Sequence, residues 1–183
     1  MRPRPEESRR KWGRTWTLRA GLPVLLLGAF FWAIIYGGAE ARVKRATARV
    51  VRVAEKAEEE SPVSLGLFAN RLGKFLATNA VLELEGFGTL ATGRKEIVSF
   101  FAQVRSSLAK IEFARPEITV AAAGQGAVNA RVAARYRLAS AAGEAAEGDG
   151  TADLLWNKGA GGWQISRAEL RAAEGARLPG GWK

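Results

Sequence analysis

The chain has 183 residues, a formal net charge of +10, and neither cysteine nor histidine. Its composition, 48% hydrophobic and 25% charged, is typical of a globular protein with one domain and an appendage. The missing residue types exclude disulfides, thiolate nucleophiles and the usual zinc sites, and they remove the commonest general base. We therefore expect no metal and no cofactor, and any proton transfer must use carboxylates, lysines or the two tyrosines.

The positive charge is concentrated at the N-terminal end. Residues 1–60 contain 13 Lys and Arg against 7 Asp and Glu, a net charge of +6, which leaves +4 for the other 123 residues. Basic residues that flank an apolar run usually contact anionic lipid and influence topology. No motif interleaves aromatic and arginine side chains as a base-stacking surface would. Nucleic acid is therefore not an expected partner.

A transmembrane helix is predicted over residues 20–38, after a basic tail over residues 1–19. The segment AGLPVLLLGAFFWAIIYGG has 19 residues without a charge, and as a helix it would span about 29 Å, which matches the bilayer core. Trp16 and Tyr36 lie near its ends, where aromatic rings favour the headgroup region. A cleaved signal peptide is the competing interpretation, because Ala39-Glu40-Ala41 resembles a cleavage site, but the apolar core is long for one.

The flanking charges leave the orientation of this helix nearly undecided, because basic residues lie on both sides of it. A compact basic tail is easily kept in the cytoplasm while the following domain is translocated. We therefore expect a single-pass protein of a bacterial-type plasma (inner) membrane, with a cytoplasmic N-terminus and an extracytoplasmic domain. The lipid membrane is the first partner that the sequence predicts.

Residues 39–60 are predicted to form a helix that is either a stalk or the first helix of the domain, ending before Ser61-Pro62. Apolar residues at spacings of three and four give it one apolar seam. The alternatives are that the seam packs on the domain's own sheet beside a solvated basic row, or that the basic row contacts the membrane surface. The seam contains Val43, Ala46, Val50, Val53 and Ala57, and the basic row contains Arg42, Arg45, Arg49, Arg52 and Lys56.

Residues 61–171 are predicted to form an α+β domain, followed by a C-terminal tail over residues 172–183. The stretches SLGLFANRLGKFLATN and GRKEIVSFFAQVRSSL have helical apolar spacing. Between them VLELE alternates as a strand does and leads into the loop GFGTLATG. The remainder has strand character, and VNARVAARYRL alternates like a half-buried antiparallel strand. The expected order is helix, helix, strand, helix and four strands, with the helices against one antiparallel sheet.

This order, together with the segments NAVLELEG, TGRKEIVSFF and GGWQISRAEL, resembles the NTF2-like superfamily, which includes SnoaL-like polyketide cyclases and ketosteroid isomerases. The resemblance covers roughly residues 42–171. It implies a cone in which a strongly curved antiparallel sheet wraps around helices and a ligand pocket. Membrane-tethered domains of this shape also resemble the assembly subunits of type IV secretion systems and the Mce-associated proteins of lipid-import machinery, and no motif here selects either.

The resemblance implies where a catalytic base should lie. Isomerases use an Asp just after the strand entry, and Leu84 occupies that place here. Glu83 and Glu85 flank it but point to the opposite face, because side chains alternate along a strand. The tyrosine that binds the oxyanion on the family's first helix has no counterpart.

One role of the isomerase site does have a candidate. Asp153, in DLLWNKGAGG, aligns with the acid that donates a proton to the oxyanion, although pairing with Arg131 or Arg135 on a neighbouring strand explains it equally well. The catalytic candidates are Asp153, Glu83, Glu85 and Tyr136. The candidates for lining a pocket are Trp156, Trp163, Tyr136, Phe101 and Leu84.

Two functions remain open from the sequence. The preferred one is a non-catalytic binding or assembly module near the membrane, with a membrane-complex protein or a second copy of the chain as its partner. The alternative is a membrane-tethered enzyme of the SnoaL or isomerase type, or a binder of a small hydrophobic carbonyl ligand. A fold by itself does not choose between them, but the missing base favours the non-catalytic function.

Overall fold

The computed structural model describes residues 38–57 and 60–172. Within these two ranges no helix combines the length and the apolar character needed to cross a bilayer. The predicted transmembrane helix over residues 20–38 lies outside the described residues except for Gly38. The basic tail over residues 1–19 and the C-terminal tail beyond Ala172 also lie outside them.

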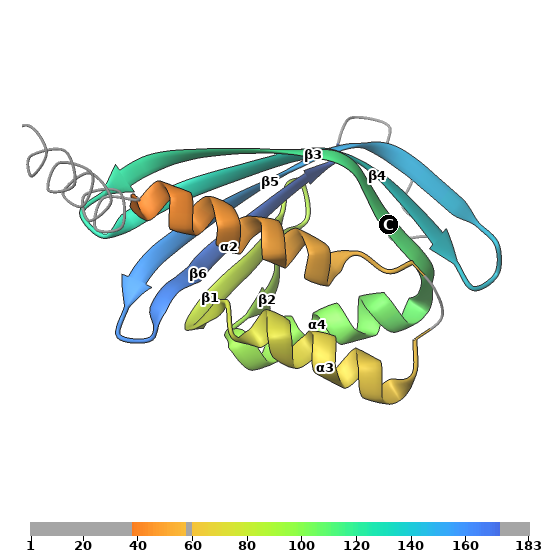
Figure 1. The fold of residues 1–183 in the computed structure, drawn as a ribbon. Coiled ribbons are helices and arrows are strands. Elements are labelled where there is room, and N and C mark those ends of the chain that lie inside the picture. The colour runs from red at the N-terminus through yellow and green to blue at the C-terminus, as the bar shows by residue number, and fades with distance from the viewer. Residues whose placement is uncertain (1–37, 58–59, 173–183) are drawn as a thin grey trace, which may run out of the picture. The chain divides into compact units, whose positions relative to one another are not determined.

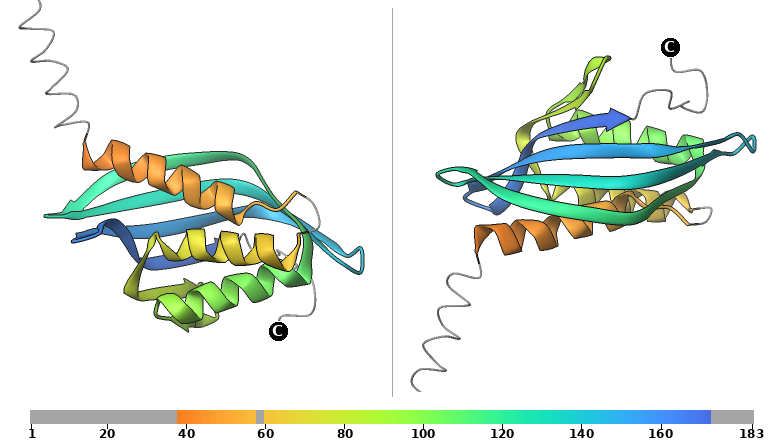
Figure 2. Two further views of the ribbon diagram at one scale, coloured as in Figure 1. Left: turned by 60° about the horizontal axis from the view of Figure 1, so that its bottom comes forward. Right: turned by 90° about the horizontal axis from the view of Figure 1, so that it is seen from above.

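The described chain folds into three helices and six strands, in an α+β arrangement (Figure 1). The helices lie on one side of the sheet, and α3 and α4 run side by side (Figure 2). The elements are α2 Ala39–Ala54, α3 Pro62–Gly73, β1 Leu76–Leu84, β2 Gly88–Thr92, α4 Arg94–Ser107, β3 Leu108–Gly124, β4 Ala127–Ser140, β5 Ala145–Gly159 and β6 Gly162–Ala172.

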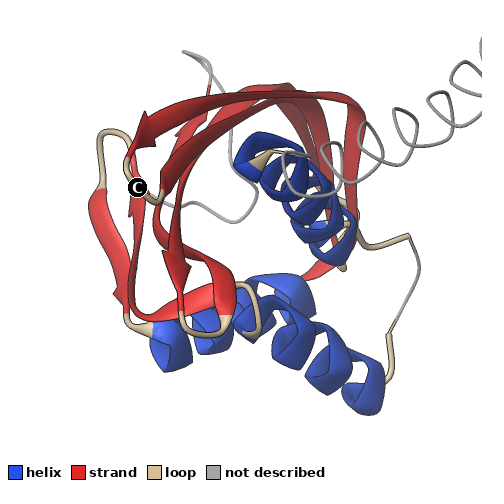
Figure 3. Cartoon of the chain, turned by 60° about the vertical axis from the view of Figure 1, so that its left-hand side comes forward, coloured by secondary structure: helices blue, strands red, loops and turns tan. Residues whose placement is uncertain are grey.

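The six strands form one curved, mixed sheet in the order β2-β1-β6-β5-β4-β3 (Figure 3). Neighbouring strands are antiparallel except β1 and β6, which are parallel. The expectation of a purely antiparallel sheet is therefore wrong at this pair. Short hairpins join antiparallel neighbours, whereas β1 and β6 are connected through α4 and four further strands, which leaves them free to run in the same direction.

The segment GFGTLATG, expected to be a loop, contains strand β2. Gly86 and Gly88 adopt φ angles of 81° and 79°, which glycine reaches without a steric penalty. The chain can therefore reverse direction tightly, and Gly88 pairs back onto Leu84 of β1. The domain thus has one more strand than its alternation pattern indicated.

Two predicted helices end earlier than expected because strand pairing takes over their last residues. Helix α3 ends at Gly73, and Phe75 accepts a hydrogen bond through its C=O from the N–H of Ile165, with an N···O distance of 2.7 Å. Helix α2 ends at Ala54, and Lys56 exchanges backbone hydrogen bonds of 2.8 and 2.9 Å with Ile111 at the start of β3. Both ends are therefore set by the sheet.

The core lies between the helices and the concave face of the sheet. In β4, Val128, Ala130 and Val132 are buried, in agreement with the predicted alternation. Helix α2 contributes Val43, which is fully buried, and Val53, and both belong to this core. The prediction that the apolar seam packs on the domain's own sheet is confirmed for Val43, Ala46, Val50 and Val53, whereas Ala57 is exposed.

Candidate functional site

Asp153 lies on the outer face of the sheet, away from the helices. Its neighbour Leu154 is buried in the core, so the side chain of Asp153 points the other way. Arg131 of β4 donates two hydrogen bonds to its carboxylate, from Nε to Oδ1 at 2.8 Å and from Nη2 to Oδ2 at 3.0 Å. Pairing with Arg131, one of the two interpretations left open by the sequence, is thus confirmed.

These contacts determine the protonation state of Asp153. The hydrogen bonds from Arg131 lower the pKa of Asp153 below its usual value, against the opposing effect of burial, and the positive charges of Arg131 and Arg171 add to the lowering. Arg171 Nη1 lies 3.5 Å from Oδ2. The carboxyl group is therefore ionised at neutral pH and holds no proton to donate to an oxyanion.

The other two carboxylate candidates also face arginines on the outer face. Arg167 donates from Nε and Nη2 to Glu83 Oε2 at 2.8 and 2.6 Å. Glu85 Oε2 lies 3.6 Å from Nε of Arg171. The structure thus brings the three acidic candidates to one face of the sheet, where they form ion pairs, and leaves them on the opposite side from the helices.

Two aromatic candidates belong to the buried interior. Trp156 is fully buried, and its ring stands nearly perpendicular to Phe75 with 6.3 Å between the ring centroids. Tyr136 is also buried, and its hydroxyl would lie 2.8 Å from a Cβ at Gly148. Burial raises the pKa of Tyr136, and the charge of Asp149 adds to this. The phenol therefore stays protonated at neutral pH.

The remaining pocket candidates are partly buried. Phe101 and Trp163 pack against the core, and Leu84 lies at the end of β1. None of the five pocket candidates lines either of two hollows in the described chain. One is a cleft between α2 and α3, the α2–α3 cleft, and the other is a cavity on the outer face of the sheet, the outer-face cavity. The outer-face cavity has a volume of about 460 Å³ and carries both signs of charge, with Glu117 and Asp149 beside Arg115, Arg135 and Arg171.

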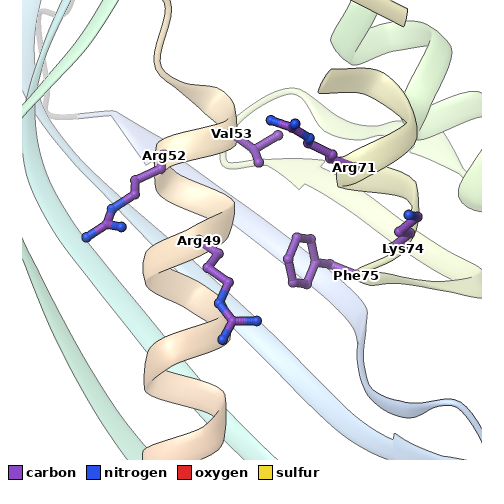
Figure 4. A pocket seen from close by; sticks show the side chains of 6 residues that line it. All are labelled: Arg49, Arg52, Val53, Arg71, Lys74 and Phe75. Carbon is purple, nitrogen blue, oxygen red and sulfur yellow. The ribbon is translucent and has the colours of Figure 1, made fainter. Parts of the chain in front are cut away.

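The α2–α3 cleft has a volume of about 290 Å³ and lies between α2 and the C-terminal end of α3. Val53 and Phe75 are the apolar part of its lining. In Figure 4 the Arg49 side chain lies on the side of the Phe75 ring that faces α2, whereas the Arg71 and Arg52 side chains extend away from the ring. The basic part of the lining consists of Arg49, Arg52, Arg71 and Lys74.

The charge of this cleft is of one sign. None of its lining residues is acidic, and among the described residues Arg49, Arg52 and Lys74 form no ion pair. The guanidinium of Arg71 lies 5.5 Å from the ring centroid of Phe68, a cation–π contact. Arg71 lies in the last turn of α3 and Lys74 directly follows its last residue, where the helix dipole favours positive charge. The cleft can attract an anion, and its lining contains no carboxylate base.

A buried group of charges holds the two sides of the cleft in place. Arg105 of α4 is 1% exposed and donates to the carbonyl oxygens of Val53, Ala54 and Glu55 at 2.8, 3.1 and 2.7 Å. It also donates to both carboxylate oxygens of Glu60. These carbonyls are the groups that the end of α2 leaves without helical partners, so Arg105 caps α2.

Lys56 provides the reciprocal contact. Its ammonium group donates to the carbonyl oxygens of Arg105 and Leu108 at 2.9 and 2.6 Å, and so caps the end of α4. Lys56 is 7% exposed and follows the end of α2, so it does not continue the predicted basic row. The members of that row that are exposed on α2 are Arg42, Arg45, Arg49 and Arg52. We call Lys56, Glu60 and Arg105 the buried lock.

Four residues of the cleft and the buried lock are not among the site residues predicted from the sequence: Arg71, Lys74, Phe75 and Arg105. Arg71 and Lys74 have a usable signal, because basic residues in and just after the last turn of a helix are favoured by the helix dipole and mark that end as positively charged. Arg105 lies four residues after Phe101 and eight after Ile97, so its spacing places it on the apolar face of α4, but the residue type is one that is almost never buried unless paired. Within residues 38–57 and 60–172, no three His, Cys, Asp or Glu side chains are grouped as a metal site.

Comparison with known proteins gives structural matches only. No protein-family model matches the sequence, and no curated protein matches it. An NTF2-like protein with a cystatin-like fold from Novosphingobium aromaticivorans shares 16% identity, with 90% of this chain and 94% of that chain covered, and a TM-score of 0.54. A conserved protein from Planctomyces limnophilus shares 14% identity over 71% of this chain and 92% of its own, with a TM-score of 0.56.

A third match is a protein from Novosphingobium aromaticivorans that is provisionally named a scytalone dehydratase. It shares 17% identity, with 70% of this chain and 82% of that chain covered, and a TM-score of 0.53. Identities this low carry no information on activity, but the three alignments agree on architecture. The three helices and the curved mixed sheet of this chain have the NTF2-like, cystatin-like α+β fold.

Proposed function

We propose that the protein is a single-pass membrane protein whose NTF2-like domain is a non-catalytic binding and assembly module next to the membrane. The observation that carries this proposal is the separation of charges in the domain. The acidic groups that would transfer protons are ion-paired on the outer face of the sheet, whereas the α2–α3 cleft is lined by basic and apolar side chains. Such a cleft binds a ligand but supplies no carboxylate for proton abstraction.

The membrane location is supported by the uncharged segment over residues 20–38, which immediately precedes α2. In the proposed topology the N-terminus is cytoplasmic and the domain lies outside a bacterial-type inner membrane. The natural absence of cysteine makes a direct test simple, because a single introduced cysteine is the only thiol. The two probe sites are Ser8→Cys in the tail and Ala160→Cys in the exposed turn between β5 and β6.

We expect the full-length chain to stay in bacterial membranes through alkaline carbonate extraction. In intact spheroplasts, a membrane-impermeant maleimide should label Ala160→Cys and leave Ser8→Cys unlabelled until the membrane is permeabilised. Release by carbonate, or a mature chain that lacks its first forty or so residues, contradicts the anchor. The reverse labelling pattern contradicts only the orientation.

An assembly role is supported by exposed apolar side chains on α3. Val63 and Leu67 are 73% and 54% exposed and lie one helical turn apart, on one face of the helix. Exposed apolar groups that cluster are typical of protein contacts. We expect cross-linking in membranes to trap a second copy or another membrane protein in fixed proportion, and the double substitution Val63→Asp with Leu67→Asp to abolish the product. A cross-linking pattern that this substitution leaves unchanged contradicts a contact through α3.

A further inference from the structure

The α2–α3 cleft combines positive charge with apolar surface, and a solvated surface does not require this combination. Arg49, Arg71 and Lys74 supply positive charge, while Val53 and Phe75 supply apolar surface in the same lining. Arginine binds phosphate oxygens in a bidentate manner, and lysine acts on them as a mobile point charge. Apolar carbon atoms next to such a group favour a ligand that is itself anionic at one end and apolar at the other.

The positive charges of the cleft also lack compensation among the described residues. Like charges that face each other repel, and the repulsion is strongest where protein rather than water lies between them. The α3 dipole and the ring of Phe68 offset part of this for Arg71, but Arg49 comes from a different helix. A bound anion would relieve the repulsion on both sides of the cleft at once.

The size of the cleft limits what can enter it. Sites that enclose a drug-sized ligand usually have volumes of roughly 300–1,000 Å³. At about 290 Å³ and open to solvent, the cleft accommodates a headgroup with the first part of its chain rather than a whole amphiphile. The remainder of such a ligand has to lie in another apolar phase.

The position of the cleft along the chain indicates which phase that is. Arg49 is ten residues beyond Ala39, where α2 begins, so it lies roughly 15 Å along the helix from that end. The uncharged segment over residues 20–38 ends at the same point. If that segment spans the bilayer as proposed above, the cleft is within reach of the lipid headgroups.

We propose that the α2–α3 cleft binds the phosphate headgroup of an anionic phospholipid, with Arg49, Arg71 and Lys74 around the phosphate and Val53 and Phe75 against the beginning of the acyl chains. This inference rests on the proposed membrane location for its source of ligand. The inference gives the cations of the cleft one specific role, contact with a single lipid phosphate. The basic row of α2 would in addition attract anionic lipids in general.

The test uses the full-length protein in a non-ionic detergent and counts bound lipids by native mass spectrometry. The probes are a short-chain phosphatidylglycerol, the phosphatidylcholine with the same chains, and inorganic phosphate. We expect one phosphatidylglycerol per chain, bound at least about tenfold more tightly than phosphatidylcholine, because charge-assisted contacts to the phosphate are not offset by a choline group. Inorganic phosphate at equal concentration should not displace it.

Two double variants separate the cleft from the other exposed cations of α2. Arg49→Gln with Lys74→Gln removes two charges from the cleft, and Lys44→Gln with Arg45→Gln removes two exposed charges from α2 outside it. We expect the first variant to lose the preference for phosphatidylglycerol by about tenfold and the second to keep it within about twofold. All four residues are exposed, so neither variant should melt at a lower temperature than the wild type.

Three results would overturn the proposal: equal binding of the two lipids by the wild type, equal losses in the two double variants, or displacement of phosphatidylglycerol by equimolar phosphate. The last result would assign the cleft to a soluble phosphate compound. Lipid binding in detergent does not require a spanning helix, whereas resistance to carbonate extraction depends only on such a helix. An anchored protein without lipid preference therefore refutes the cleft proposal alone, and an unanchored protein with the preference refutes the anchor alone.

Discussion

Two sets of charged side chains meet near the C-terminal end of α2, and their surroundings differ. In the buried lock, Arg105 and Lys56 are almost inaccessible to solvent and donate to carbonyl and carboxylate oxygens. In the α2–α3 cleft, Arg49 and Lys74 are exposed and form no ion pair among the described residues. A cation that is buried against the free carbonyl oxygens of a helix end stabilises the fold. A cation that is exposed and donates to no such oxygen remains available to a ligand.

The two sets are mechanically connected. Arg105 binds the last carbonyls of α2 and stacks on Phe68 of α3, with 4.4 Å from the guanidinium carbon to the ring centroid. It therefore links the end of α2 to the middle of α3, and both helices line the cleft. Changes in the buried lock should lower stability strongly and affect the cleft indirectly, whereas changes in the cleft should weaken binding without lowering stability.

The largest expected effect is that of Arg105→Met. The substitution leaves Glu60 without its hydrogen-bonded partner and three carbonyls without a donor. Loss of one partner from a buried ion pair costs about 3 to 5 kcal/mol. We expect a loss of this size in the free energy of unfolding, measured by circular dichroism on the full-length protein in detergent. Arg137→Met is the matched control, because Arg137 is 63% exposed in its ion pair, and a similar loss in this control would contradict the comparison.

Lys56→Met should have the next largest effect. Methionine replaces the apolar stem of the side chain but leaves the carbonyl oxygens of Arg105 and Leu108 without their buried donor. An unsatisfied buried acceptor costs about 1 to 3 kcal/mol. The same unfolding measurement should therefore rank Lys56→Met between the wild type and Arg105→Met. An unchanged unfolding transition would show that Lys56 does not act as a cap.

The buried lock also predicts a pH dependence with a definite sign. The hydrogen bond from Arg105 lowers the pKa of Glu60 below its usual value of 4.5, against the opposing effect of burial. A carboxyl group whose pKa is lower in the folded than in the unfolded state adds stability above the unfolded value, and this contribution declines as the pH falls through the folded value. Unfolding measured from pH 7 to pH 3 should show this decline.

Glu60→Gln removes the titrating group and serves as the control for this prediction. We expect the variant to be less stable than the wild type at pH 7 and to lose less stability on acidification, while other paired carboxylates such as Asp153 continue to titrate. Parallel curves for the two proteins would contradict the assignment to Glu60.

Patterns that depend on neighbours in the chain were predictable from the sequence. The alternation in VNARVAARYRL identified the buried face of β4, and the spacing of valines in ARVKRATARVVRVA identified the packed seam of α2. Both patterns reflect burial of one face of a single element. The α+β class and the resemblance to the NTF2-like fold followed from the order of such elements.

Features that depend on contacts between distant residues were not predictable in this way. Phe75 and Leu76 keep helical spacing but belong to the strand region, because Ile165 on β6 pairs with them. Burial of Arg105 depends on carbonyls about fifty residues earlier in the chain. The α2–α3 cleft arises from two helix ends that the sequence does not show to be neighbours. The outer-face pair of Asp153 and Arg131 was one of two pairings that the sequence left open, because strand registers offer few partners.

That pair provides the next prediction, an intermediate case in the comparison of charges. Asp153→Asn removes the carboxylate from Arg131, whose side chain is 57% exposed. Exposed ion pairs contribute little because water and salt screen them. We expect a small destabilisation, well below that of Lys56→Met and smaller still in high salt. A loss as large as that of Arg105→Met would show that the outer-face pairs stabilise the fold as strongly as the buried lock.

The smallest expected effect on stability is that of the cleft variant Arg49→Gln with Lys74→Gln, and its sign distinguishes the two charge sets. Because both side chains are exposed and lack ion pairs among the described residues, the substitutions break no hydrogen bond that supports the fold, and they reduce repulsion across the cleft. We expect an unchanged or slightly higher melting temperature in low salt.

Added salt should raise the melting temperature of the wild type toward that of the variant, since screening and removal of charge relieve the same repulsion. A clear destabilisation by the double substitution would mean that the cleft cations are structural, as Arg105 and Lys56 are, and that ligand binding is not needed to explain them.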